Sequence, residues 1–425
     1  MSGIVRAAVI VCLSFALGSY KVTAQSQLNF FHEDSLKSTV SFLASDELQG
    51  RGNFTYSLEN AALFISAEFK IWGLQPLHNN TQSYLLPFVV GLNKETFESV
   101  TINGESLKSK SFYFSSSYQY PPEIHTEDFT IVALNSFSTK DVISNLNQYI
   151  DSISGPILFT VPASQKAMLP FIRKKSSALH KPFHTVLIIV SDDEHPDVSI
   201  TLSKEARRNM LFNVAAVLPG KRLADEVVLI TAHYDHIGVN MTVGDGISNG
   251  ANDNASGTAA MLAMAKYFAT TASNERTIVF VAFAGEELGL KGSFYMANNF
   301  NCSNVKSMFN LEMLGKPGKE GKKALIITEE NNSDLKKIMR KYSKAIKIID
   351  DRNTTEKLFS RSDNYPFALN KVAAHTFMCF SDTDNTYHKT TDEVKTLDFE
   401  NMSLLVSGLL PGIEAVVSGA ESPKD

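Results

Sequence analysis

The sequence of 425 residues has few cysteines, no strong excess of either charge, and no long apolar run beyond its first residues. Three cysteines cannot form the disulfide framework of a small secreted scaffold. A net charge of −5 provides no basic surplus, which excludes general nucleic-acid binding. With 44% hydrophobic and 20% charged residues, the chain is neither disordered nor collagen-like, and it is long enough to bury a sizeable core.

The first 24 residues have the pattern of a secretory signal peptide. Arg6 supplies the positive charge, residues 7–18 form an apolar run too short for a membrane helix, and small residues precede a cleavage point before Gln25. A buried N-terminal helix is the alternative interpretation. Because no later apolar run could span a bilayer, we expect a secreted or periplasmic protein with no membrane span after signal cleavage.

The sequence does not decide whether its cysteines form a disulfide or whether its asparagines are glycosylated. Cys302 and Cys379 would remain after signal cleavage, and two separate buried thiols are a simpler expectation than one disulfide. Several triplets of the type Asn-x-Ser/Thr occur, for example at Asn53 and Asn254, but such triplets often arise by chance and do not decide whether the protein is glycosylated.

Three regions follow the predicted signal, and the first two differ in their periodicity. In residues 25–90, apolar spacing predicts helices over 34–44 and 58–72, separated by a polar loop that contains glycine. Residues 91–205 instead contain short β-type runs bounded by turn signals, which we interpret as a β-rich insertion. The alternative is that its strands belong to the main sheet; the predicted strands are 129–134, 156–161 and 185–190.

Residues 206–425 alternate between apolar runs and helical patterns, which indicates an α/β sheet covered by helices. The run at 227–231 is almost continuously apolar, as expected of a central strand covered on both faces. Functional residues in such sheets lie just beyond the carboxyl ends of the strands. The predicted strands are 227–231, 277–283 and 325–328, and the predicted helices are 258–268, 291–298 and 335–345.

Polar clusters follow two of these strands. His233 and Asp235 come directly after the first strand, and residues at i and i+2 of an extended segment point the same way. A histidine backed by a carboxylate is typical of a metal ligand, although a hydrogen-bonded loop histidine is the commoner case. Glu286 and Glu287 follow the strand at 277–283, where two adjacent carboxylates are costly without a nearby cation, unless both simply face water at a helix start.

Further candidates lie in the loops between the helices and strands. Asp253 belongs to residues 250–257 (Gly-Ala-Asn-Asp-Asn-Ala-Ser-Gly), whose small residues permit close backbone approach, while helix capping is the simpler explanation. Glu312 and His388 are isolated, and each alone would more often be structural. Taken together, His233, Asp253, Glu287, Glu312 and His388 form a nitrogen and oxygen ligand set that suits Zn²⁺, and with one bridging carboxylate they could hold two ions.

Four motifs in this order resemble the co-catalytic di-zinc aminopeptidases, the group of aminopeptidases Y and S. That family also includes glutamate carboxypeptidase II and, by descent, the glutaminyl cyclases. The resemblance covers about residues 34–85 and 213–415. It implies a zinc-exopeptidase fold, which is a three-layer α-β-α sandwich around a central mixed, mostly parallel sheet. The intervening stretch resembles the protease-associated insertion of many members.

The resemblance also implies a role for each candidate. His233 would bind the first zinc and Asp235 would orient it, while Asp253 would bridge two zinc ions. Glu287 and His388 would complete the second site, and Glu286 would act as general base. Glu312 stands where the family most often has Asp. The implied cofactor is therefore two Zn²⁺ ions per chain.

The implied substrate is a peptide with a free N-terminus, cleaved one residue at a time by an aminopeptidase. The implied substrate-binding residues are Arg361, Asp363, Asn364 and Tyr387; the family often has His in place of Asn364. Three alternatives remain: a single-zinc transferase like the glutaminyl cyclases, a binding module that has lost its ligands, and a carboxypeptidase or dipeptidase that uses Arg361 for a substrate carboxylate. The sequence does not indicate an oligomeric state.

Overall fold

The computed structural model describes most of the chain after the predicted signal peptide, which lies outside the described residues. The described residues are 30–77, 83–90, 97–108, 110–116, 123–134, 141–153, 156–175, 179, 185–202, 210–240, 245–328, 333–351, 358–381 and 383–424. No helix among them is long and apolar enough to cross a membrane.

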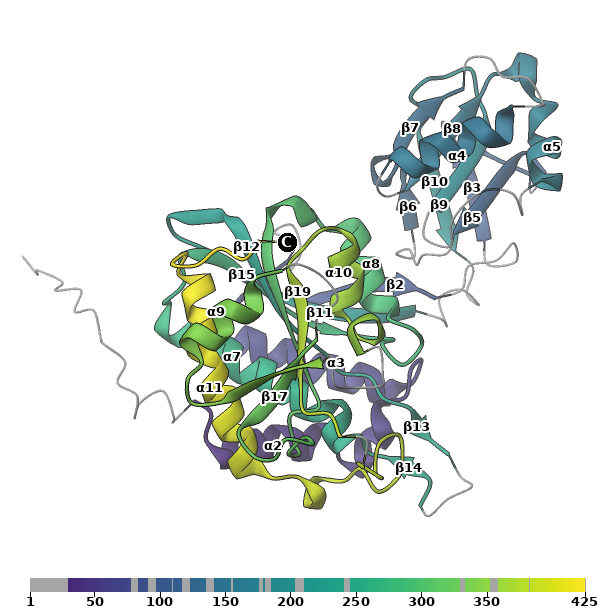
Figure 1. The fold of residues 1–425 in the computed structure, drawn as a ribbon. Coiled ribbons are helices and arrows are strands. Elements are labelled where there is room, and N and C mark those ends of the chain that lie inside the picture. Colours follow the sequence, from purple (N-terminus) through teal and green to yellow (C-terminus); the bar gives the residue numbers. More distant parts are fainter. Residues whose placement is uncertain are drawn as a thin grey trace, which may run out of the picture.

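A nine-stranded mixed sheet forms the centre of the fold (Figure 1). Its strands are β1 (Gln75–Pro76), β2 (Leu85–Val89), β11 (Met210–Leu218), β12 (Leu223–His233), β15 (Arg276–Phe283), β16 (Val305–Glu312), β17 (Ala324–Ile327), β18 (Lys347–Asp350) and β19 (Ala374–Met378). The order is β1-β11-β15-β12-β16-β19-β17-β18, with β2 also beside β11. The four neighbours β15, β12, β16 and β19 are parallel, whereas β11 pairs antiparallel with β1, β2 and β15, and β17 with β19.

Helices cover both faces of this sheet. One face packs against α2 (Glu33–Leu43), α3 (Tyr56–Ile71), α7 (Gly257–Thr271), α9 (Leu335–Tyr342) and α11 (Phe399–Val417). The other packs against α8 (Lys291–Asn299) and α10 (Asn364–Leu369). The predicted three-layer α/β architecture is therefore confirmed.

The alternation of side chains along β12 explains why this strand lies at the centre. Val228, Ile230 and Ala232 contact the core on the face covered by α2, α3, α7, α9 and α11, while Leu229 faces α8 and α10. All four are fully buried. Both faces of the strand are apolar because both are covered by helices.

The predicted helices and strands after residue 206 are all present, with small shifts at their ends. The helix predicted over 335–345 ends at Tyr342. The long C-terminal helix α11, which begins at Phe399, was not predicted. Asp398 caps its N-terminus, where its side chain accepts a hydrogen bond from the backbone N–H of Asn401. A short hairpin, β13 (Gly238–Val239) and β14 (Ile247–Ser248), follows β12.

The stretch between residues 97 and 202 forms two further four-stranded sheets, drawn apart from the nine-stranded sheet in Figure 1. One contains β3 (Phe97–Ile102), β4 (Glu105–Ser106), β6 (Glu123–His125) and β10 (Val198–Leu202). The other contains β5 (Phe112–Ser116), β7 (Thr130–Ala133), β8 (Ile157–Val161) and β9 (Thr185–Val190). The three strands predicted here thus pair with one another, and α4 (Val142–Ser152) and α5 (Met168–Lys174) complete this stretch.

Candidate metal centre

The parallel core of the sheet places the polar clusters at one edge. β12 ends at His233, the strand β15 leads directly into Glu286 and Glu287, and β16 ends at Glu312. Because these three strands are parallel neighbours, their carboxyl ends meet. Asp253 lies in the irregular turn Ala251–Ser256 that precedes α7, and His388 comes from the loop before α11.

Asp253 lies between two histidines that come from different parts of the chain. Its Oδ1 is 3.4 Å from Nε2 of His233, and its Oδ2 is 3.2 Å from Nε2 of His388. Nε2 of His388 is also 3.1 Å from Oε2 of Glu287. The two oxygens of the Asp253 carboxylate thus face imidazoles from different parts of the chain.

His236 is a further member of this cluster that the sequence analysis did not single out. Its Nδ1 lies 3.0 Å from Oε1 of Glu287 and 3.7 Å from Oδ2 of Asp253. Ligand atoms of His236, Asp253, Glu287 and His388 all lie within 4.8 Å of one another. In the sequence, the only local indication of this role is that a second histidine stands three residues after His233.

The unsatisfied atoms of the cluster show that these residues fit a metal ion. Oδ2 of Asp253 is buried and makes no hydrogen bond of acceptable geometry, despite the nearby imidazole of His388. Nε2 of His236 is also buried and lacks a hydrogen-bond partner. Buried polar atoms are normally satisfied, and imidazole nitrogens with carboxylate oxygens suit Zn²⁺.

Asp235, which was predicted to orient His233, also contacts the backbone of both glutamates. Nδ1 of His233 is 3.2 Å from the backbone oxygen of Asp235 and 3.7 Å from its carboxylate. That carboxylate accepts hydrogen bonds from the backbone N–H groups of Glu286 and Glu287, at 3.1 and 3.2 Å. Asn53 donates a third, over 2.7 Å. Asp235 therefore orients the turn that carries both glutamates.

The asparagines of the two example triplets, Asn53 and Asn254, both form hydrogen bonds inside the fold. The amide of Asn53 is used by Asp235. Asn254 is fully buried, where its Oδ1 accepts hydrogen bonds from the backbone N–H groups of Gly257 and Met313. The side-chain nitrogen of Asn254 donates to the backbone oxygen of Leu311 over 3.1 Å. Neither side-chain nitrogen could therefore carry a glycan without breaking these contacts.

Asp392 and Gly250 fix the backbone around Asp253. The buried carboxylate of Asp392 accepts hydrogen bonds from the backbone N–H groups of Asn252 and Asp253, each at 3.0 Å. Gly250 has φ +61°, and a Cβ added there would lie 2.5 Å from a ring carbon of His236. Glycine is required because the backbone must pass directly against this histidine.

Arg51 links the N-terminal region to the two ligand-bearing loops. Its fully buried guanidinium donates to the backbone oxygens of Tyr234, Asn249 and Gly250 over 2.7–2.9 Å, and also to that of Leu43. Burial lowers the pKa of Arg51 to about 10, although Asp253 and Asp392 oppose this shift. Arg51 remains a cation at neutral pH beneath an acidic site.

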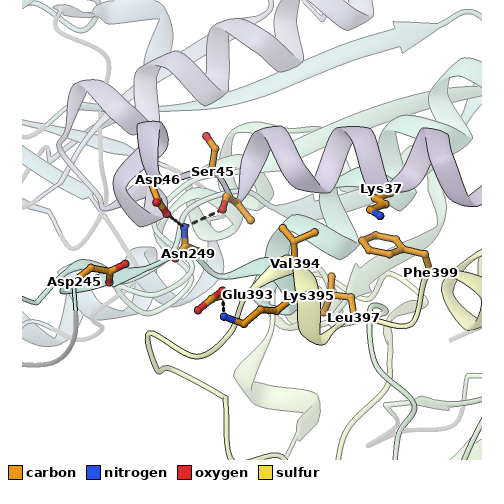
Figure 2. A pocket seen from close by; sticks show the side chains of 11 residues that line it. Lys37, Ser45, Asp46, Asp245, Asn249, Glu393, Val394, Lys395, Leu397 and Phe399 are labelled. Carbon is orange, nitrogen blue, oxygen red and sulfur yellow. Dashed lines mark hydrogen bonds and ion pairs between the residues drawn. The ribbon is translucent and has the colours of Figure 1, made fainter.

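Asn249, whose backbone oxygen accepts from Arg51, also lines a cavity of about 650 Å³, shown in Figure 2. Its side chain donates to the backbone oxygen of Ala44 and to Asp46, at 2.9 and 2.8 Å. This cavity is larger than the one at the metal centre, but it contains none of the clustered ligand atoms. We therefore assign the chemistry to the smaller cavity.

The smaller cavity, of about 150 Å³, opens beside Asp253, Glu286 and Glu312. The remaining described residues that line it are Met313, Leu358, Arg361, Ser362, Met378, Phe380 and Tyr387. Two of the four predicted substrate-binding residues, Arg361 and Tyr387, are among them. The other two, Asp363 and Asn364, are fully buried outside this lining, so the geometry does not support a substrate contact for either.

Burial and mutual repulsion shift the ionisation of the acidic groups. Burial raises the pKa of Glu286 well above its usual range, and the charges of Glu312 and Asp363 add to this effect. Burial also raises the pKa of Glu312, which is 9% exposed. For His388, burial lowers the pKa, but contacts with Asp253 and Glu287 outweigh it and raise the value to about 10.

Residues 213–408 match the family model described as Peptidase family M28. This region belongs to peptidase family M28. A probable leucine aminopeptidase of Trichophyton verrucosum is 31% identical over 204 residues, covering 45% of this chain and 53% of that protein. Aminopeptidase YwaD of Bacillus subtilis is 26% identical over 206 residues, covering 47% and 43%. The chain thus spans about half the length of these curated relatives.

Solved structures of aminopeptidases share the fold of this chain. The zinc aminopeptidase BSAP from Bacillus subtilis has a TM-score of 0.53 at 18% identity, covering 92% of this chain and 97% of that one. The aminopeptidase from Aneurinibacillus sp. strain AM-1 has a TM-score of 0.52 at 16% identity, covering 93% and 96%. The family resemblance seen in the motifs is therefore confirmed, and the likeness to these structures establishes the fold.

Proposed function

We propose that this protein is a zinc-dependent aminopeptidase that hydrolyses the N-terminal bond of peptides with two metal ions. The observation that carries the proposal is Asp253, whose two carboxylate oxygens face His233 and His388. His233, Asp253 and Glu312 would hold one zinc ion, and Asp253, Glu287 and His388 the other. The names of the relatives, leucine aminopeptidase and aminopeptidase, support the same reaction class.

Glu286 is the proposed general base. It lines the cavity beside Asp253, and its backbone is held by Asp235. Zinc bound at this centre would supply Lewis acidity toward the scissile carbonyl and would lower the pKa of a water molecule toward neutrality. Glu286 would accept the proton of the attacking water and pass it to the leaving amine.

The substrate would bind in the cavity with its free amine beside the carboxylates. Glu286, Glu312 and Asp253 present negative charge that would attract an ammonium group. Met313, Leu358, Met378 and Phe380 provide apolar surface for the first side chain. The signal-peptide pattern of residues 1–24 supports secretion or export to the periplasm as the setting of this reaction.

A panel of paired substrates tests the proposal. Aminoacyl-anilides with a free amine should be hydrolysed, and their N-acetylated counterparts should not. A chelator should abolish the activity, and added Zn²⁺ should restore it with two ions bound per chain. Equal rates on free and blocked substrates would overturn the exopeptidase assignment, and a fully active metal-free protein would overturn the metal requirement.

Arg361 favours a second candidate, a dipeptidase or carboxypeptidase on the same scaffold. Its side chain lines the cavity and could pair with the carboxylate of a short substrate. Comparing a dipeptide with its C-terminal amide separates the two functions. A dipeptidase should lose most of its rate with the amide, whereas an aminopeptidase should cleave both.

A further inference from the structure

A row of polar side chains crosses the centre of the sheet beneath the metal centre. Thr231 on β12 pairs with Asn310 on β16, and Asn310 pairs with Thr376 on β19. All three are fully buried, on the side of the sheet that faces α8 and α10. Polar groups at such positions are costly unless every one is hydrogen-bonded, so the row requires an explanation.

The hydrogen bonds of this row run in one direction. The hydroxyl of Thr231 donates to Oδ1 of Asn310 over 2.8 Å, which leaves the Asn310 amide nitrogen to donate. That nitrogen donates to Oγ of Ser362 over 2.8 Å and to Oγ1 of Thr376 over 3.0 Å. Thr376 in turn lies 2.8 Å from Oδ1 of Asn364, which can accept its proton.

Ser362 is the end of the row that faces the metal centre. Because its oxygen already accepts from Asn310, its single proton is available to donate, and it donates to Oε2 of Glu312. Glu312 lines the cavity together with Asp253 and Glu286. Oε2 of Glu312 therefore accepts a hydrogen bond from a neutral donor. The single proton of Ser362 is used by that bond, so Ser362 does not donate to Oε1.

We propose that Ser362 is a positioning residue that restricts Glu312 to a metal contact through one oxygen, Oε1. This inference rests on the proposed function, in which Glu312 is a metal ligand. Glutamate has one more rotatable bond than aspartate, so its carboxylate can turn to offer both oxygens. A directed hydrogen bond to one oxygen removes that freedom and fixes the ligand's orientation.

Zinc titration of the metal-free protein tests the proposal without relying on activity. We expect wild type to bind two Zn²⁺ ions in competition with a chromogenic chelator, and Ser362→Ala to bind one of them about 10–100-fold more weakly. The matched control is Ser307→Ala. Ser307 is also fully buried and lies on the same strand as Glu312, but its hydroxyl donates to the backbone oxygen of Ala373, away from Ser362.

A double-mutant cycle separates positioning from a general loss of stability. Aspartate at position 312 is shorter by one methylene group, which should lengthen its contact with Ser362, so we expect Ser362→Ala to change zinc affinity less in a Glu312→Asp background. A loss in that background equal to the loss in wild type would overturn the proposal. So would equal losses in Ser362→Ala and Ser307→Ala, or wild-type zinc affinity in Ser362→Ala.

An experimental structure of the zinc-loaded wild-type protein provides a second measurement that does not require any variant to fold. It should show Glu312 bound through one oxygen while the other accepts from Ser362. Bidentate coordination by Glu312 would overturn the inference but leave the proposed function intact. Failure of wild type to bind two zinc ions would instead overturn the two-metal function, and this inference with it.

Discussion

The backbone N–H of Glu286 donates a hydrogen bond of 3.1 Å to Oδ1 of Asp235. The adjacent N–H of Glu287 donates to the other oxygen of the same carboxylate. One buried acid at the end of β12 thereby sets the backbone of two glutamates at the end of β15. With their main chain fixed in this way, the two side chains point in different directions. Glu286 lines the cavity, whereas Glu287 contacts His388, so the two residues can take different roles.

Replacing these two glutamates separately should separate chemistry from metal binding. Glu286→Gln should lower kcat by about 10²–10⁴-fold with both zinc ions retained, because it removes a general base. Glu287→Gln should instead lower zinc content, because it removes a ligand that contacts His388 and His236. Steady-state kinetics with elemental analysis measures both effects. Normal turnover by Glu286→Gln would reject it as the base.

Asn53 should contribute to activity although it lies outside the matched family region. Asn53→Ala removes the donor to Asp235 and should reduce kcat/KM by about 10–100-fold, as expected for a partner of a metal-site residue. Asn298→Ala is the matched control, because its amide donates only to a carbonyl within α8. Equal activity of the two variants would show that the Asn53 contact is not needed.

Arg51 should be required for stability. Arg51→Met leaves four backbone oxygens without their donor, and a loss of more than about 3 kcal/mol in the free energy of unfolding is expected. Arg51→Lys should lose less, because an ammonium keeps the charge but not the fork of donors. Urea unfolding measures both. Wild-type stability of Arg51→Met would contradict the role assigned to this buried cation.

The pair of Glu226 and Arg276 should make stability depend on pH. Arg276 is buried and also anchors the C-terminal residues Val416 and Glu421, and its side chain lowers the pKa of Glu226. A lowered folded-state pKa stabilises the fold above the unfolded pKa, near 4.5, and this contribution is lost as pH falls through the folded value.

Glu226→Gln should therefore cost about 1–2 kcal/mol at neutral pH, and less than that in acid. The control Glu320→Gln, which removes an exposed pair with Lys347, should change the free energy of unfolding by less than about 1 kcal/mol. Urea unfolding across the acid range checks both variants. A constant difference between wild type and Glu226→Gln at all pH values would contradict the linkage.

Some candidate ligands could be located from the sequence because they directly follow a strand, whereas His388 lies in a loop with no such local signal. His233 and Glu287 stand directly after apolar runs, and parallel strands bring their ends together. His236, Arg51 and Asn53 could not be assigned in the same way. Their roles depend on contacts with residues about 50 to 200 positions away, such as Glu287, Gly250 and Asp235, and local periodicity carries no information about such pairs.

Periodicity and motif order alone were sufficient for the α/β class, the location of the helices and strands after residue 206, and the resemblance to aminopeptidases that the family match of residues 213–408 confirms. The separation of β7, β8 and β9 from the central sheet, the contacts of Asp235 and the burial of Asp363 and Asn364 were decided only by the tertiary structure. The physical reason is the range of the interactions. Helix and strand patterns repeat over a few residues, whereas a buried hydrogen bond depends on which distant groups the folded chain brings within about 3 Å.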